Sequence, residues 1–332
     1  MKSYTLKATA DHGTLERVDV PVPEAGPQQL LVRMRAAALN RGEFIIGHGL
    51  TKAGSVKAIG MEGAGEIAKL GAGVTGFHIG QRVMGRCPGA FAEYALMDVR
   101  ETIDVPDNLS WEEAASIPLT FMVVHDILFG QGHLKAGEWV LVLGVSSGVG
   151  VAALQAAKER GAKVIGTSGA KDKLDRLKSQ GLDVGICTRG ADFHELVMEV
   201  TGGKGVDLVV NTVGGTVFAE AVRSMGFEGR LAQVGYVDGS LEARLDLQAL
   251  HAKRLSLYGV SNKLRTAEQR AAGVPAFIKD ILPGIAAGRI KPVIDRVFPF
   301  AQLEQARAHM EANRHLGKIV IAMPEHPAGK EA

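Results

Sequence analysis

The segment 140–150 constrains the fold of this chain more than any other. An apolar run, Val140-Leu-Val-Leu, breaks into the small residues Gly144-Val-Ser-Ser-Gly-Val-Gly and continues as an Ala-rich stretch. A second apolar run, Ala162-Lys-Val-Ile-Gly-Thr, follows. Strand, small-residue turn, helix and strand form the unit that seats a dinucleotide pyrophosphate at a helix N-terminus, because only small side chains let backbone amides approach the phosphates. The segment therefore predicts a dinucleotide-binding βαβ unit.

The turn itself supports two further interpretations. A G-x-G-x-x-G template over residues 145–150 finds only its last glycine, although Gly144, Gly148 and Gly150 offer the same chemistry at another spacing. An ordinary strand-to-helix turn is the simplest alternative. The same residues also match G-x-S-x-G, the nucleophile elbow of α/β-hydrolases, with Ser146 as the nucleophile.

Length and composition narrow the class of protein. The 332 residues suffice for two domains, and 46% hydrophobic with 22% charged residues is ordinary for a globular enzyme. A net charge of +2 without a basic block gives no reason to expect a nucleic-acid partner. We see neither the apolar core of a signal peptide nor a run of ~18 apolar residues that a membrane helix needs. We expect a soluble, cytoplasmic protein without a membrane partner.

The two cysteines, Cys87 and Cys187, lie far apart in the sequence. They build no disulfide framework and no C-x-x-C zinc motif. We expect both to be buried small hydrophobic residues.

The pattern of apolar and turn-forming residues changes near Trp111. Before it, short β-like runs separated by Gly and Pro predict a compact β-barrel-like module. After it, helical segments alternate with apolar strands at 183–187, 205–211, 229–235 and 255–259, which indicates a doubly wound parallel sheet. Helical stretches at 267–287 and 301–313 precede a last strand at 318–322. The fold class is therefore α/β, with a barrel and a parallel sheet.

The end of the second strand of the βαβ unit indicates which nucleotide is bound. An NAD site carries an Asp or Glu there for the ribose 2′-hydroxyl. This chain instead reads Gly166-Thr-Ser-Gly-Ala-Lys, with no acid before Asp172. Ser168 and Lys171 suit a 2′-phosphate, which a carboxylate would repel, so NADPH is favoured over NADH. Alternatively, Lys171 and its neighbours form the solvated first turn of a helix.

Eight blocks in the same order make the chain resemble the zinc-independent, quinone oxidoreductase branch of the medium-chain dehydrogenase/reductase superfamily. They lie at 38–43, 60–67, 70–77, 80–83, 91–94, 140–150, 205–215 and 314–321. The resemblance implies a GroES-like catalytic domain formed by residues 1–118 and 261–332, with a Rossmann NADPH-binding domain inserted at 119–260. It places the cofactor in a cleft between the two domains and assigns the Ser146 turn to pyrophosphate binding rather than to hydrolysis.

No metal is expected. Zinc-containing members of the superfamily carry a catalytic Cys near position 40 and Gly-His-Glu near position 60, where this chain has Asn40 and Gly60-Met61-Glu62. A thioether does not replace imidazole at such a site. The cysteine lobe for structural zinc is also missing, and none of the ten histidines has a recognisable ligand spacing.

The activity that the resemblance implies is hydride transfer from NADPH to the activated C=C of a small α,β-unsaturated carbonyl compound or to a quinone. Asn40 matches the family's cleft Asn and is the first catalytic candidate; the alternative is that it only ties its loop together. His48 is a second candidate, as a proton source, unless it is simply an exposed loop residue. The substrate-pocket candidates are Ile45, Ile46, Leu50 and Thr120. Many relatives have Asp at position 43 and Tyr at position 45, so Glu43 and Ile45 suggest a more apolar pocket.

The resemblance also implies cofactor contacts along the sheet. The candidates are Ser146, Ser147, Gly148, Val149 and Gly150 at the pyrophosphate, Ser168 and Lys171 at the 2′-phosphate, and Asn211, Gly235, Tyr236, Val260, Ser261 and Lys318 towards the nicotinamide. Two other functions stay open, a zinc-free ketone, aldehyde or imine reductase and a non-catalytic NADPH-binding protein. Relatives often form homodimers through sheet edges, and residues 254–259 are the candidate edge here.

Overall fold

The computed structural model describes residues 1–9, 13–45 and 54–324. The chain forms two compact units. Unit 1 comprises Met1–Leu119, Ala267–Val274 and Pro292–Ala332, and unit 2 comprises Thr120–Thr266 and Pro275–Lys291. Residues 275–291 thus group with unit 2, although the sequence assigns them to the barrel. Compact units are not the same as family domains, and the expected domain boundaries stay a prediction.

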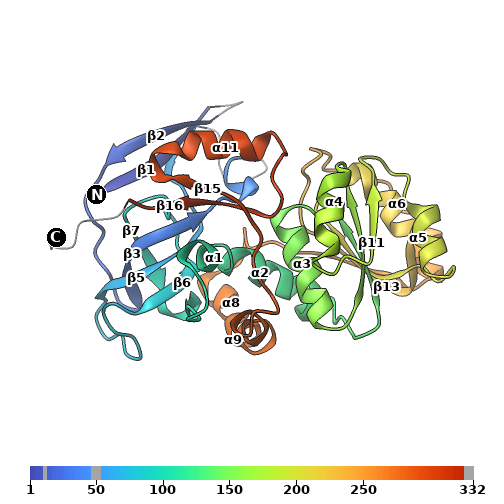
Figure 1. The fold of residues 1–332 in the computed structure, drawn as a ribbon, viewed down its shortest axis with the longest axis horizontal. Coiled ribbons are helices and arrows are strands. Elements are labelled where there is room, and N and C mark those ends of the chain that lie inside the picture. The colour runs from blue at the N-terminus through green and yellow to red at the C-terminus, as the bar shows by residue number, and fades with distance from the viewer. Residues whose placement is uncertain (10–12, 46–53, 325–332) are drawn as a thin grey trace. The chain divides into compact units, whose positions relative to one another are not determined.

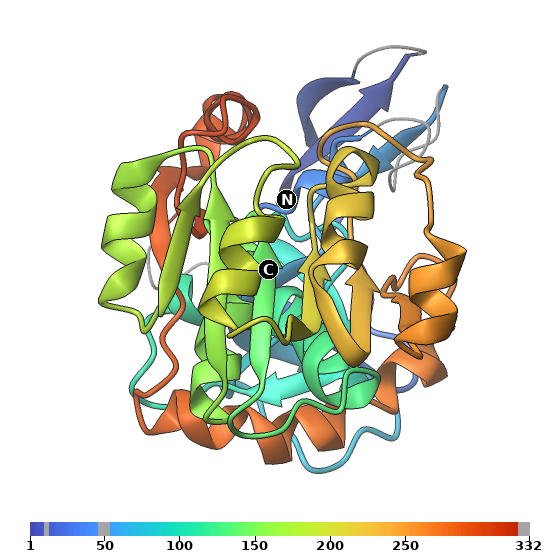
Figure 2. The same cartoon turned by 90° about the vertical axis from the view of Figure 1, so that its right-hand side faces the viewer.

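Unit 2 is built on a six-stranded parallel sheet. Its strands are β9 (Trp139–Leu143), β10 (Lys163–Ser168), β11 (Val184–Cys187), β12 (Val206–Asn211), β13 (Met225–Gln233) and β14 (Ser256–Gly259). They lie side by side in the order β11-β10-β9-β12-β13-β14 (Figure 2). Numbered along the chain this is 3-2-1-4-5-6, the order of a dinucleotide-binding doubly wound sheet. The parallel sheet expected from the sequence is confirmed.

Helices cover both faces of this sheet. α3 (Gly148–Glu159) and α4 (Lys171–Lys178) lie on one face, with α5 (His194–Val200) and α6 (Phe218–Arg223) on the other (Figure 1). The central strand β9 is accordingly a continuous apolar run, and Val140, Leu141, Val142 and Leu143 are fully buried. The remaining helices of this unit are α7 (Leu247–Ala252), η3 (Asp126–Gly130), η4 (Gly215–Val217) and α10 (Leu282–Ala286), with most of α2 (Pro118–His125) and of α9 (Val274–Asp280).

Unit 1 contains two mainly antiparallel sheets. The first is β2-β1-β4, with β1 (Lys2–Ala8), β2 (Gly13–Asp19) and β4 (Val56–Ala58). The second runs β15-β16-β3-β5-β6-β8, and β7 (Tyr94–Asp98) also pairs with β3. Its strands are β3 (Gln29–Ala38), β5 (Glu62–Leu70), β6 (Arg82–Arg86), β8 (Thr102–Asp104), β15 (Ile294–Pro299) and β16 (Lys318–Ala322). β16 pairs with β3, so chain segments from both ends of the sequence build one sheet.

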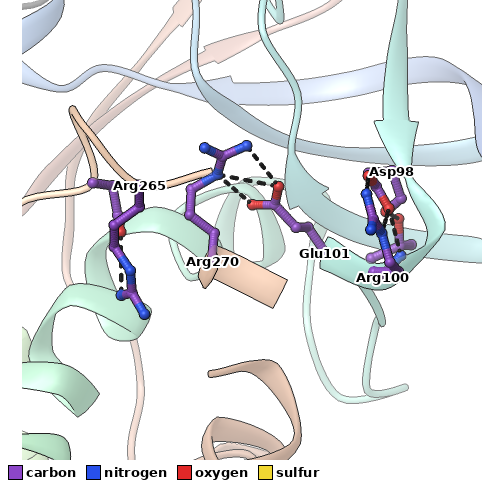
Figure 3. A network of polar contacts seen from close by, with 7 residues as sticks. Asp98, Arg100, Glu101, Arg265 and Arg270 are labelled. Carbon is purple, nitrogen blue, oxygen red and sulfur yellow. Dashed lines mark hydrogen bonds and ion pairs between the residues drawn. The ribbon is translucent and has the colours of Figure 1, made fainter. Parts of the chain in front are cut away.

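The short helices of unit 1 connect these strands. They are η1 (Arg41–Glu43), η2 (Val99–Glu101), α1 (Trp111–Ala115), α8 (Ala267–Ala271), η5 (Phe300–Gln302) and α11 (Leu303–Glu311). Arg270 of α8 forms an ion pair with the buried Glu101, and Arg100 forms another with Asp98 at the end of β7 (Figure 3). The Arg270–Glu101 pair attaches α8 to η2, which precedes it by more than 150 residues in the sequence.

Two expectations about single residues have different outcomes. Cys87 is buried, as expected, but Cys187 is exposed. Cys187 ends β11, the outermost strand of the parallel sheet, where a side chain has a neighbouring strand on one side only. The expectation that both thiols are buried was therefore wrong for Cys187. Within the part of the chain that the structure describes, no helix has the length and apolarity needed to span a membrane.

Candidate active site

The turn after β9 is closed by two glycines, Gly144 and Gly150, at which a Cβ would clash with neighbouring atoms. Gly144 has φ +76°, and a Cβ there would lie 2.7 Å from Thr212 Oγ1. A Cβ on Gly150 would lie 2.5 Å from the carbonyl oxygen of Gly144. Gly150 therefore lets the start of α3 pack directly against the end of β9, as the last glycine of a dinucleotide fingerprint does.

The start of α3 fits a pyrophosphate. Ser147 is its N-cap, and the Ser147 hydroxyl accepts a hydrogen bond from the Gly150 amide at 3.0 Å. The amides of Gly148 and Val149 have no acceptor within the helix, because the first turn of a helix lacks preceding carbonyls. Free amides and the helix dipole together attract an anion. The residues present thus fit the phosphates of a dinucleotide.

The Ser146 hydroxyl is hydrogen-bonded to the hydroxyl of Ser168 and not to a side chain that could act as a general base. Its Oγ lies 3.2 Å from Ser168 Oγ, so the ends of the turn and of β10 are joined by a hydrogen bond. A serine nucleophile needs a hydrogen-bonded imidazole or an equivalent base. The contact with Ser168 therefore argues against the nucleophile-elbow interpretation.

The sequence analysis predicts that the adenosine ribose of the cofactor binds at the end of β10. Ser168 is the last residue of β10, and the first acid after it, Asp172, lies in α4. Lys171 is the first residue of α4, with an exposed side chain that forms an ion pair with Asp175 at 2.5 Å. Both interpretations of Lys171, phosphate ligand and solvated helix start, remain compatible with this position.

Asn211 holds together the loops beyond β12 and β13. Its Nδ2 donates to the Gly214 carbonyl at 3.0 Å and to Gln233 Oε1 at 2.8 Å, while its Oδ1 accepts from the amides of Val213 and Gly214. Gln233 in turn donates to the carbonyl of Gly235. Asn211 and Gln233 pair directly across the sheet, both at strand ends. Sequence reasoning missed Gln233, although a polar residue closing an apolar strand is the same signal that pointed to Asn211.

The other residues predicted towards the nicotinamide lie in the same loops. Tyr236 is 41% exposed, Val260 is buried and donates its amide to the Gln233 carbonyl, and the Ser261 hydroxyl accepts from the Lys263 amide. Because parallel strands end at one edge of the sheet, these residues and the Ser146 turn share that edge.

A second cluster, the Lys318 network, lies in unit 1 and consists of Asn40, Glu43, Glu62 and Lys318. Lys318 Nζ donates to Glu62 Oε1 at 2.8 Å, to Asn40 Oδ1 at 2.9 Å and to the Leu39 carbonyl at 2.9 Å. Asn40 Nδ2 donates to Glu43 Oε1 and to Glu62 Oε1, both at 3.0 Å. The ammonium is thus surrounded by three acceptors and the Asn40 amide by three partners.

The Glu43 carboxyl group is fully buried in this network. Its Oε2 accepts from the Gly60 amide at 3.0 Å. Burial, together with the nearby Glu62, raises the pKa of Glu43 to about 7, against the opposing effects of the Asn40 hydrogen bond and of Lys318. Glu62 Oε2 accepts from the Leu119 amide at 2.7 Å, so Glu62 is held by a cation and two amides. Sequence reasoning noted Glu43 only as a departure from the family.

The Lys318 network limits what Asn40 can do. Both N–H groups of the Asn40 amide are bound by carboxylates, which leaves no side-chain donor for a substrate carbonyl in this arrangement. The three Lys318 donors are likewise used. Direct roles for Asn40 in catalysis and for Lys318 at the cofactor stay predictions, and the alternative that Asn40 braces its loop gains support.

The remaining pocket candidates are placed as follows. Ile45 is half-buried just after η1, and Thr120 is buried in α2. Ile46, His48 and Leu50 lie outside the described residues. Among residues 1–9, 13–45 and 54–324, no group of three or more His, Cys, Asp or Glu side chains is arranged to hold a metal ion.

Two family models match the chain. The model described as "Alcohol dehydrogenase GroES-like domain" matches residues 26–107, and the model described as "Zinc-binding dehydrogenase" matches residues 148–273. With the parallel sheet and its glycine turn, these matches define the class of protein, a dehydrogenase or reductase that joins a GroES-like module to a Rossmann sheet.

Solved structures and curated relatives narrow the class. A mycobacterial protein, Rv1454c complexed with NADPH, is 29% identical with a TM-score of 0.86 over 97% of this chain and 100% of that one. A quinone oxidoreductase from Pseudomonas syringae pv. Tomato DC3000 is 27% identical with a TM-score of 0.85 over 97% and 99%. A phenolphthiocerol/phthiocerol polyketide synthase protein of Mycobacterium tuberculosis is 31% identical over 95% of this chain, which spans 14% of that synthase. The chain belongs to the medium-chain dehydrogenase/reductase superfamily, in its quinone oxidoreductase-like branch, and it is an oxidoreductase of that family.

Proposed function

We propose that this oxidoreductase uses NADPH, without a metal, to reduce the activated C=C of a small α,β-unsaturated carbonyl compound or a quinone. The single observation that carries the proposal is the β9–α3 turn, where Gly144 and Gly150 leave room only for backbone and the first amides of α3 are free for phosphate. The similar Rv1454c is complexed with NADPH, which supports the choice of nucleotide.

Two further features support the choice of NADPH over NADH and a reaction without a metal. Ser168 ends β10 where an NAD site has an acid, so a 2′-phosphate meets a hydroxyl instead of a carboxylate. Asn40 and Met61 occupy the positions of the catalytic zinc ligands in metal-dependent relatives, and Asn40 is engaged by Glu43, Glu62 and Lys318. Neither an amide held in this way nor a thioether suits zinc.

NADPH, when bound, supplies the hydride. The chain's own residues bind and orient: the Gly148 and Val149 amides would hold the pyrophosphate, and Asn211 and Gln233 fix the backbone of the loops beyond β12 and β13. Loops fixed in this way would limit the movement of a bound nicotinamide, and correct positioning supplies much of the rate of a hydride transfer. Addition of hydride to the activated C=C or to a quinone leaves negative charge on the carbonyl oxygen, as an enolate or hydroquinone anion, which needs a hydrogen-bond donor, and the proton comes from His48 or from water.

The test begins with nucleotide binding and ends with product analysis. The purified protein is titrated with NADPH and NADH, and oxidation of the reduced nicotinamide is then followed with a quinone and with a cyclic enone. We expect preferential NADPH binding, with hydroquinone or saturated ketone as the product. An allylic alcohol from the enone would instead identify a ketone, aldehyde or imine reductase on the same scaffold. Failure to bind either nucleotide would remove the basis of the proposal.

One observation favours a second candidate, a non-catalytic NADPH-binding protein. In the Lys318 network, the side chain that the family resemblance places nearest the chemistry, Asn40, has no donor left for a substrate. Tight NADPH binding without oxidation across a panel of quinones, enones and ketones would favour this candidate over the reductase.

A further inference from the structure

A cation that the sequence does not single out lies beside the end of β10. Arg189 follows β11, and its side chain crosses the backbone of Gly169, the residue after β10. A Cβ at position 169 would lie 2.5 Å from Arg189 Cγ and 2.6 Å from its Cζ, and it would also meet Nε. Only glycine at position 169 therefore leaves space for the guanidinium in this place.

The loop that carries Arg189 is fixed to β10. The Thr188 amide donates to the Ser168 carbonyl at 3.0 Å, which extends the pairing of β10 with β11 by one residue. The Thr188 hydroxyl donates to Asp192 and accepts from the Gly190 amide at 2.9 Å, so the Asp192 carboxylate is engaged within its own loop. The position of Arg189 next to Ser168 is thus held by backbone and side-chain hydrogen bonds.

The charges of Arg189 and Lys171 differ in their surroundings. Lys171 forms an ion pair with Asp175 four residues along α4. The Arg189 guanidinium is exposed and makes no hydrogen bond or ion pair with any residue that the structure describes. Arg189 is therefore the cation at this end of β10 whose charge is not already balanced by a carboxylate.

We propose that Arg189, rather than Lys171, selects a phosphate on the 2′-position of the adenosine ribose. The inference rests on the proposed function, since it assumes that NADPH lies along the carboxyl edge of the sheet. In a sheet of this order the ribose 2′-position lies at the end of the second strand, which is β10. A guanidinium binds a phosphate through two parallel hydrogen bonds, which an ammonium does not.

Arg189→Gln and Lys171→Gln make a matched pair, because each removes one positive charge from the same corner of the sheet. Dissociation constants are measured by calorimetry for NADPH, NADH, 2′,5′-ADP and 5′-AMP. For Arg189→Gln we expect NADPH and 2′,5′-ADP to bind about tenfold or more weakly, with NADH and 5′-AMP within about twofold of wild type. For Lys171→Gln we expect changes below about threefold for all four ligands.

Gly169→Ala tests the geometry without removing a charge. The added methyl group displaces the guanidinium, so the variant should lose preference for 2′,5′-ADP over 5′-AMP as Arg189→Gln does, while 5′-AMP binding stays unchanged. The inference is wrong if Arg189→Gln leaves 2′,5′-ADP binding intact, if it weakens both mononucleotides equally, or if Lys171→Gln has the larger effect. Those outcomes leave the wild-type preference for NADPH in place. A wild-type protein that binds neither dinucleotide would instead refute the proposed function together with the inference.

Discussion

Glu43 couples the stability of the fold to pH. Its pKa is raised from 4.5 to about 7, so the folded chain binds more protons than the unfolded chain between these pH values. The free energy of unfolding therefore falls as pH rises through this window, by on the order of 3 kcal/mol. Glu43→Gln abolishes the titration, and we expect a flatter pH profile of stability in urea unfolding from about pH 5 to about pH 8.

The control for Glu43→Gln is Glu24→Gln, which makes the same chemical change at an exposed position. Its pH profile should run parallel to that of the wild type. Equal pH slopes for wild type and Glu43→Gln would show that Glu43 is ionised throughout this range in the folded chain.

Lys318 and Glu62 form the most deeply buried ion pair described in unit 1, with side chains 7% and 0% exposed. Lys318→Met leaves the Glu62 carboxylate buried without its cation, and we expect a loss of about 3–5 kcal/mol in unfolding free energy. Adding Glu62→Gln should recover part of that loss, because the uncompensated charge is then gone. Urea unfolding of the two single variants and the double variant measures the coupling, and strictly additive losses would contradict it.

The sequence indicated Asn40 and Lys318 as site residues, but it did not show that their side chains form a hydrogen bond with each other. The partners of Asn40 lie three, 22 and 278 residues away, so no local pattern reveals that its amide is saturated. Arg189 was missed for the same reason, because its position depends on the pairing of β10 with β11. Residue types at strand ends, such as Asn211 and Ser168, were visible because parallel strands place their ends together.

At the scale of elements, the β9–α3 turn depends on the missing side chain of Gly150. Gly150→Ala places a methyl group against the Gly144 carbonyl, and either the helix or the turn must move. We expect a loss of about 1–3 kcal/mol in stability and a weaker affinity for NADPH, measured by urea unfolding and nucleotide titration. Gly259→Ala is the control, because its Cβ meets nothing within 4 Å in the same sheet. Equal affinities for all three proteins would mean that the turn does not hold the nucleotide.

Strands could be predicted from the sequence where a run of apolar residues is long and unbroken. The strands at 205–211 and 318–322 coincide within one residue with β12 and β16, because buried strands need unbroken apolar runs. The helical stretch at 267–287 is instead three short helices, α8, α9 and α10. Gly273 lies between the first two, and Pro283 stands in the first turn of α10, where its ring is tolerated. Breaks of this kind are encoded by single residues and are easily underestimated in a helical pattern.

For the whole molecule, the exposed end of the parallel sheet carries the last prediction. β14 pairs with β13 and, among the described residues, with no other strand, although the Gln131 side chain donates to the Gly259 carbonyl at 3.4 Å, so β14 is an edge strand open to pairing with another strand. We propose that two copies pair through β14, giving a homodimer of about 70 kDa, twice the 35.1 kDa of one chain. Gly259→Glu has space for its side chain and would place one carboxylate of each copy at such an interface. We expect light scattering at micromolar concentration to find the wild type and Ser179→Glu, which adds the same charge at the end of α4, as dimers and Gly259→Glu as a monomer. A monomeric wild type would refute the dimer, and a dimeric Gly259→Glu would move the interface away from β14.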